Sequence, residues 1–96
     1  MKAICKKPGE PAEVVDIENR LEALQEAVGG HLESFTFAVD ACVLCDEEGR
    51  WKGYPHNTMI CGVEFVGPIL IVGVAGEDFT DLKAPERVLD MLWPKS

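Results

Sequence analysis

A Cys-x-x-Cys pair is the motif in this chain whose spacing most readily suggests chemistry. Cys42 and Cys45 have the spacing of thiolate pairs that bind zinc or carry out redox reactions. The two residues between them continue an apolar run over 41–45, which is typical of a buried strand. Residues three apart on a strand point to opposite faces, so we expect these thiols to be small buried hydrophobes. Cys5 and Cys61 would complete a metal site only if the fold brought all four together.

A second group of chemically capable residues lies in the segment 50–60, which has no helical or strand period. It combines cations, aromatic rings and hydrogen-bonding side chains within an acidic chain, which suits a small anionic or base-containing ligand. We therefore predict ligand or partner binding by Arg50, Trp51, Lys52, Tyr54, His56 and Asn57. In the alternative interpretation, the two aromatic residues cap the edge of the core and Asn57 bonds to its own backbone.

Two acidic groups have both a functional and a structural interpretation. Three glutamates at helical spacing would form one acidic stripe: Glu18, Glu22 and Glu26. Such a stripe is usually solvated, although it could also mimic a phosphate backbone and inhibit a basic protein. Three acids in a later segment could hold a hard cation, but in loops they are more often turn and cap residues: Glu77, Asp78 and Asp81.

No arrangement of residues indicates an enzyme. Neither of the two histidines, His31 and His56, has a motif partner. The glycines match neither a dinucleotide fingerprint nor a phosphate loop, and they indicate bulges or close backbone approaches. We therefore expect no catalytic residues, no cofactor and no metal.

The composition predicts one globular domain over residues 1–96. The chain is 47% hydrophobic and 27% charged, and its formal charge is −8. Nine Lys and Arg residues against seventeen acids argue against direct nucleic-acid binding, which needs clustered cations. The longest apolar run is too short to span a membrane, and no export signal opens the chain, so we expect a cytoplasmic protein.

An amphipathic helix, five strands and a last helix must position these residues. The helix is expected over 17–28, where four aliphatic residues share a stripe that Gly29 and Gly30 would end: Ile17, Leu21, Leu24 and Val28. Strands are expected over 2–7, 12–17, 32–39, 41–45 and 68–74, with 76–81 as a loop. A last helix is expected over 85–93, with Pro94 as its stop and with three residues facing inward: Val88, Leu89 and Leu92.

This order, β-β-α-β-β-β-α, predicts an α+β domain with a mostly antiparallel sheet and both helices packed on one face. The strand at 68–74 is apolar on both sides of its pleat. It is therefore either central in the sheet or covered by a partner subunit, so homo-oligomerisation is left open.

Several short motifs resemble a known family: Met1-Lys2-Ala3, Lys7-Pro8-Gly9-Glu10-Pro11, Leu21-Glu22-Ala23-Leu24-Gln25, Gly53-x-Pro55-x-Asn57 and Gly76-Glu77-Asp78-Phe79-Thr80. The chain resembles a family of short proteins with a domain of unknown function, met in Firmicutes and in their phages and plasmids. The resemblance implies a phage or mobile-element setting and brings no catalytic residues. Tyr54 departs from it, because the family often has Leu or another hydrophobic residue there.

These observations lead to a hypothesis of a small, non-enzymatic binding or accessory protein that acts through the loop 50–57. Its partner would be a small anionic ligand or a host protein. One alternative is a sponge that sequesters a nucleotide-type defence signal through Arg50, Trp51, Lys52 and Tyr54. A second alternative is an acidic inhibitor of a basic protein.

Overall fold

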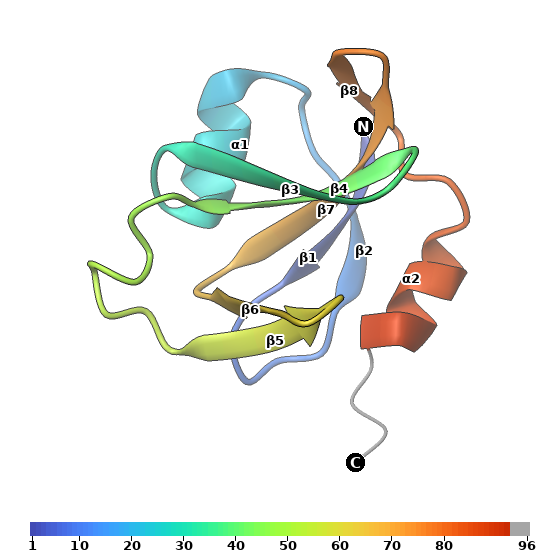
Figure 1. Cartoon of the computed structure of the whole chain (residues 1–96). Helices are drawn as coiled ribbons and strands as arrows, with labels where there is room; N and C mark the ends of the chain where they lie inside the picture. Colours follow the sequence, from blue (N-terminus) through green and yellow to red (C-terminus); the bar gives the residue numbers. More distant parts are fainter. Residues whose placement is uncertain (93–96) are drawn as a thin grey trace.

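The computed structural model describes residues 1–92 and shows an α+β fold, as the sequence predicts (Figure 1). Its elements are, in chain order, β1 (Lys2–Lys6), β2 (Glu13–Asp16), α1 (Leu21–Val28), β3 (Leu32–Ala38), β4 (Ala41–Asp46), β5 (His56–Ile60), β6 (Val63–Val66), β7 (Ile69–Ala75), β8 (Asp78–Thr80) and α2 (Pro85–Leu92). The expected order omitted β5, β6 and β8. Strands β5 and β8 come from segments that were expected to be irregular, and β6 comes from a segment to which no element was assigned. Each of the three is defined by pairing with a neighbour rather than by its own period.

Strand β7 lies at the centre of a six-stranded sheet. The order is β2-β1-β7-β4-β3, and β8 pairs with the last residues of β7. All pairs are antiparallel, with Ile71 opposite Ile4 on one side and Val43 on the other. Strands β5 and β6 form a separate two-stranded sheet. The prediction of a central strand is confirmed, so β7 needs no partner subunit to cover it.

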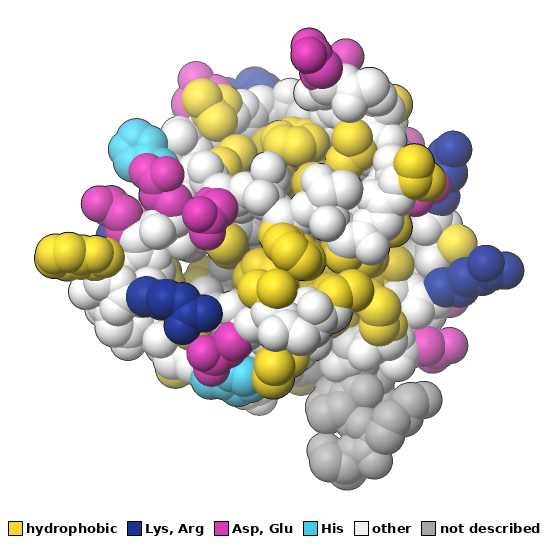
Figure 2. Space-filling view, in the orientation of Figure 1, with side chains coloured by type: hydrophobic (Ala, Val, Ile, Leu, Met, Phe, Trp, Pro, Cys, Tyr) yellow, Lys and Arg dark blue, Asp and Glu magenta, His cyan; other side chains and the backbone are white. Residues whose placement is uncertain are grey.

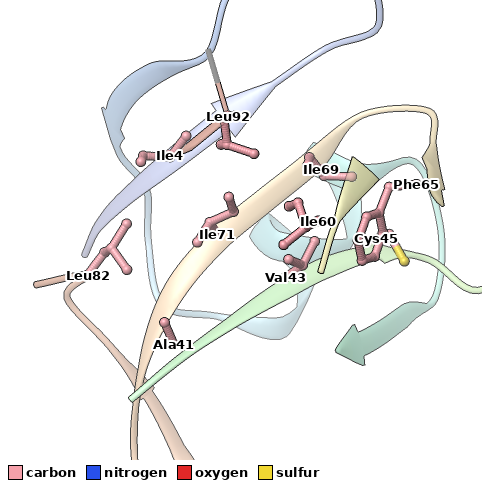
Figure 3. Close-up of a cluster of buried hydrophobic side chains, with 10 residues drawn as sticks. All are labelled: Ile4, Ala41, Val43, Cys45, Ile60, Phe65, Ile69, Ile71, Leu82 and Leu92. Carbon is pink, nitrogen blue, oxygen red and sulfur yellow. The ribbon is translucent and has the colours of Figure 1, made fainter. Parts of the chain in front are cut away.

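Alternate side chains of the sheet form two cores, one on each face. On one face α1 covers the residues Ala3, Cys42, Leu44, Leu70 and Val72. The opposite face carries Ile4, Val43, Ile69 and Ile71, and it is covered by the β5–β6 hairpin through Ile60 and Phe65 and by α2 through Leu92 (Figure 3). The expectation that both helices pack on one face is wrong, because a strand that is apolar on both sides needs a cover on each side.

Helix α1 is shorter than its aliphatic pattern predicts. It begins at Leu21 rather than Ile17, because the Ile17 N–H bonds to the Met1 C=O at 2.9 Å and so still belongs to the preceding strand region. Leu21 is 58% exposed in the first turn. Gly29 ends the helix with φ 95°, as predicted. Only half of the expected stripe is both helical and buried, namely Leu24 and Val28.

Helix α2 packs as its sequence predicts. Leu92 is buried, and Val88 and Leu89 are half-buried against the same core. The expected extension to Trp93 and the stop at Pro94 lie outside the described residues. Within residues 1–92, no helix has the length and apolar character that a membrane span requires.

Candidate binding site

Asp46, a buried carboxylate at the end of β4, fixes the base of the loop. Its side chain is 1% exposed, and its Oδ2 accepts a hydrogen bond from Lys52 Nζ at 2.7 Å. The Glu48 N–H donates to its Oδ1 at 2.9 Å. Burial raises the pKa of Asp46, but the bonds from Lys52 and Glu48 outweigh burial and hold the pKa below its ordinary value. Lys52 also donates to the Gly29 C=O at 3.0 Å, so this lysine joins the loop to the end of α1.

Tyr54 packs its ring against three glycines. A Cβ atom at Gly29 would lie 2.7 Å from the Tyr54 hydroxyl, one at Gly49 would lie 3.2 Å from the ring, and one at Gly67 would overlap the ring. Lys52 Nζ lies 5.7 Å from the ring centroid, within the range of a cation–π contact. Tyr54 therefore holds together the end of α1, the turn after β4 and the turn before β7, which is a structural role.

Arg50 and His56 share one carboxylate, that of Glu64 on β6. Arg50 Nη1 lies 3.2 Å from Glu64 Oε1, and Arg50 Nη2 donates to the Glu64 C=O at 2.9 Å. His56 Nδ1 lies 2.7 Å from the other carboxylate oxygen. The hydrogen bonds from His56 and then from Arg50 lower the pKa of Glu64. The basic side chains of the loop are thus matched by acidic groups of the chain itself.

Asn57 points into the protein rather than toward a ligand. It is buried, and its Nδ2 donates to the C=O groups of Lys6 at 2.8 Å and Gly67 at 2.7 Å. Its Oδ1 accepts from Lys6 Nζ at 2.9 Å, and Lys6 is itself buried. Asn57 therefore joins β5 to β1 and to the turn before β7, and it does not share a surface with the rest of the predicted site.

Trp51 is the residue of the loop that faces solvent most fully, at 94% exposure. The backbone around it is ordered by turns, in which the Lys52 N–H bonds to the Glu48 C=O at 2.9 Å and the Gly53 N–H bonds to the Arg50 C=O at 3.2 Å. Gly53 permits the last turn with its φ of 73°. The interpretation in which Trp51 caps the core is therefore wrong. The loop holds the indole away from the protein.

A groove of about 390 Å³ opens beside the loop, between β3 and β6. Its apolar floor includes Phe35 and Phe65, whose rings meet edge to face with centroids 5.7 Å apart. Four acidic residues line it as well: Glu33, Asp46, Glu47 and Glu64. In Figure 2, apolar side chains gather at the centre of this face and acidic ones lie to their left. No sequence pattern indicates the groove, because its residues come from separate strands with no common motif.

The cysteines do not form a metal site. Cys42 and Cys45 belong to the cores on opposite faces of the sheet, as their strand spacing predicts. Cys61 is exposed, and Cys5 packs at the edge of the α1 core. Burial, followed by the nearby Glu33 and Asp46, raises the pKa of Cys45 to about 11, so its thiol stays protonated at neutral pH.

The later acidic segment is structural in part. Asp81 accepts a hydrogen bond from the Lys2 N–H at 2.7 Å and so joins the end of β8 to the start of β1. Asp78 pairs with Ala75 at the β7–β8 turn. Among residues 1–92, no cluster of three or more His, Cys, Asp or Glu side chains has the arrangement to hold a metal ion.

The fold and this site define a small acidic α+β domain with an ordered surface loop beside an apolar groove. The chain belongs to the family of the domain of unknown function DUF3846, whose model matches residues 1–92. Comparison with curated proteins gives no match. Comparison with solved structures also gives no match.

Proposed function

We propose that this protein is a small, non-enzymatic binding protein that contacts a protein partner through the loop 50–57, with Trp51 as the anchor. The observation that carries the proposal is the 94% exposure of Trp51 on an ordered loop. An exposed indole offers a large apolar area, and tryptophan is enriched among the residues that dominate binding energy at protein interfaces. Because the loop is tied down by Asp46 and Tyr54, little conformational entropy is lost when a partner covers it.

The proposed setting is a phage or mobile element of Firmicutes, in which the protein acts as an accessory factor in the cytoplasm. The resemblance of the sequence motifs to proteins of such elements supports this setting. The four free cysteines support a reducing compartment. The formal charge of −8 favours a partner with a basic surface over nucleic acid.

The two alternatives have weaker support. A nucleotide sponge needs cations that can face a phosphate, whereas Arg50, Lys52 and His56 are each engaged by a carboxylate of the chain. An inhibitor that uses the acidic stripe needs a continuous row of free glutamates. Glu18 lies before α1, and Arg20 pairs with Glu18 at 2.7 Å and Glu22 at 3.7 Å.

The test compares wild type with Trp51→Ala and Val39→Ala variants as baits in cells of the native type of host, with native mass spectrometry of what each retains. Val39 is 98% exposed at the β3–β4 turn, so its truncation is a matched control for loss of an exposed apolar side chain. We expect a stoichiometric protein partner with wild type and Val39→Ala, and none with Trp51→Ala. Retention of that partner by Trp51→Ala would refute the proposal, and a nucleotide-sized adduct in place of a protein would favour the sponge.

A further inference from the structure

Strand β3 has a free backbone edge, and three of its residues line the groove: Glu33, Ser34 and Phe35. It is the last strand of the sheet, with β4 as its only neighbour among the described strands. The Glu47 N–H bonds to the His31 C=O at 2.9 Å, which sets the alternation of the antiparallel ladder. In an antiparallel ladder, the backbone N–H and C=O groups of alternate residues point toward and away from the neighbouring strand. Since the groups of His31 point toward β4, those of Leu32, Ser34 and Thr36 point away from it. They are ready to pair with another extended chain.

This edge has few of the features that usually protect an edge strand, and Glu33 is its one charged residue. Its seven residues include no Lys and no Pro, and the register shift comes only after Thr36, near its end. By contrast, the opposite edge strand, β2, is only four residues long and carries an acidic residue at each end. A weakly protected edge of this length is a common site for addition of a strand from another chain.

The side chains beside this edge define what the added strand must carry. Glu33 and Phe35 are two residues apart on β3, so both point to the face of the β5–β6 hairpin, where Phe35 packs on that core and Glu33 contacts Cys45. Within residues 1–92, no ion pair engages Glu33 or Glu47, whereas Glu64 is paired with Arg50 and His56. Two acids of the groove therefore remain without a cation in the described part of the chain.

We propose that the groove between β3 and β6 receives an extended, basic segment of the partner, which pairs with the β3 edge. This inference rests on the proposed function, because the segment belongs to the partner that Trp51 anchors. Cross-strand neighbours of Glu33 and Phe35 lie two residues apart on one face of the added strand, so the segment carries Lys or Arg and an apolar residue at that spacing. Its apolar side chain covers the Phe35–Phe65 floor, and its basic side chain faces Glu33 and Glu47.

A second copy of this chain fits the groove less well. Pairing of two β3 edges would bring the acidic rims of both copies together, and like charges across a strand pair are destabilising. The formal charge of −8 on each chain adds to this repulsion at low salt.

The probe is a fluorescein-labelled, capped heptapeptide, Thr-Lys-Thr-Val-Thr-Lys-Thr, titrated with the full chain and followed by fluorescence anisotropy. We expect saturable binding below about 1 mM that weakens as salt increases. The same peptide with Glu in place of Lys, and a version with backbone N-methyl groups on the edge that faces β3, should not bind. Equal binding of the N-methylated peptide, or no binding of the probe, would overturn the proposal.

Three variants locate the binding. The Glu33→Lys/Glu47→Lys double variant should lower the affinity for the probe by about fivefold or more. Glu26→Lys, on the outer face of α1, should change this affinity little. Ser34→Pro should abolish binding, because proline removes an N–H that would pair with the added strand. The variant should still fold, because this N–H points away from β4 and its loss leaves the β3–β4 ladder intact. Probe binding that survives Ser34→Pro in a folded variant contradicts the inference. A dimer in sedimentation that Ser34→Pro dissolves would assign the edge to a second copy and overturn it as well.

The same experiment separates this inference from the proposed function. Trp51→Ala should leave heptapeptide binding unchanged, because the probe is too short to need the loop tip. If Ser34→Pro and the charge reversals leave capture of the native partner intact while Trp51→Ala abolishes it, the groove inference fails and the proposed function stands. If Trp51→Ala has no effect on that capture but the groove variants abolish it, Trp51 does not anchor the partner and the proposed function is wrong on this point.

Discussion

Asp46 is the residue on which the order of the loop depends most directly. It is buried, and it accepts hydrogen bonds from Lys52 and the Glu48 N–H. We expect Asp46→Asn to lower the free energy of unfolding by about 1–3 kcal/mol, because the buried position keeps a polar group but loses the charge to which Lys52 donates. Urea denaturation measures this, with Glu48→Gln as the control, since only the backbone of Glu48 contacts Asp46. Equal stability of Asp46→Asn and wild type would show that the ion pair does not support the loop.

Gly67 is required both for its backbone conformation and for the space it leaves. It has φ 70°, and a Cβ there would overlap the Tyr54 ring. We expect Gly67→Ala to cost about 2–4 kcal/mol, the sum of left-handed strain and overpacking. Gly62 has φ 78° with open space around it, so Gly62→Ala should cost only about 1–2 kcal/mol.

A double-mutant cycle tests the cause of this difference. If the Tyr54 ring is the obstacle, Tyr54→Leu combined with Gly67→Ala should lose less stability than the sum of the two single changes. Additive losses, measured by thermal and urea unfolding, would assign the cost of Gly67→Ala to the backbone alone.

At the scale of elements, α1 provides a test of pattern against packing. The aliphatic pattern predicts that Leu21 and Leu24 are both buried, yet Leu21 is 58% exposed and Leu24 is 2% exposed. We expect Leu24→Ala to cost about 2–5 kcal/mol and Leu21→Ala about 0.5 kcal/mol or less. Urea midpoints of the two variants measure the difference. Similar losses at both positions would mean that the helix packs over its full expected length.

The hairpin β5–β6 shows why element boundaries are difficult to predict. Its strands have few residues with a clear period, and His56 and Glu64 face solvent beside buried Ile60 and Phe65. The hairpin forms because its two strands bond to each other and because Ile60 and Phe65 pack on the otherwise exposed apolar face of the large sheet. The segment therefore looks irregular along the sequence and regular in space.

For the whole molecule, the carboxylates set the response to acid. The pKa values of Asp16, Asp46 and Glu64 are below their ordinary values, so the unfolded chain binds more protons than the folded chain in the acidic range. The stability that they contribute is present above their ordinary pKa values of 3.8 and 4.5, and it is lost as the pH falls through the folded values.

We therefore expect urea midpoints to be level from about pH 8 to pH 5 and to fall below about pH 4.5. The Asp46→Asn/Glu64→Gln double variant should show a shallower fall, because two of the three groups no longer titrate. An equally steep acid limb in that variant would assign acid unfolding to other groups. Cys45 acts in the opposite range: its pKa is raised to about 11 in the fold, so stability should also fall above about pH 9, where an ordinary thiol ionises.

The sequence by itself determined the class of the fold and the character of its central strand. Residues 68–74 are apolar at every position except Gly73, and such a strand needs an apolar cover on both faces, which a central place in the sheet supplies. The same period of two placed Cys42 and Cys45 on opposite faces. These predictions hold because they depend on local geometry, which each short segment carries in its own residue types.

Only the tertiary structure decided how the predicted binding residues are used. Three of them bond to carboxylates of the chain: Arg50, Lys52 and His56. Asn57 points into the protein, and Trp51 is exposed to solvent. Their partners are the end of β4, strand β6 and the C-terminus of α1, and no local pattern encodes which of these will meet the loop. The groove and the placement of the helices on opposite faces likewise follow from burial summed over the whole chain, because each apolar face takes whichever distant segment covers it.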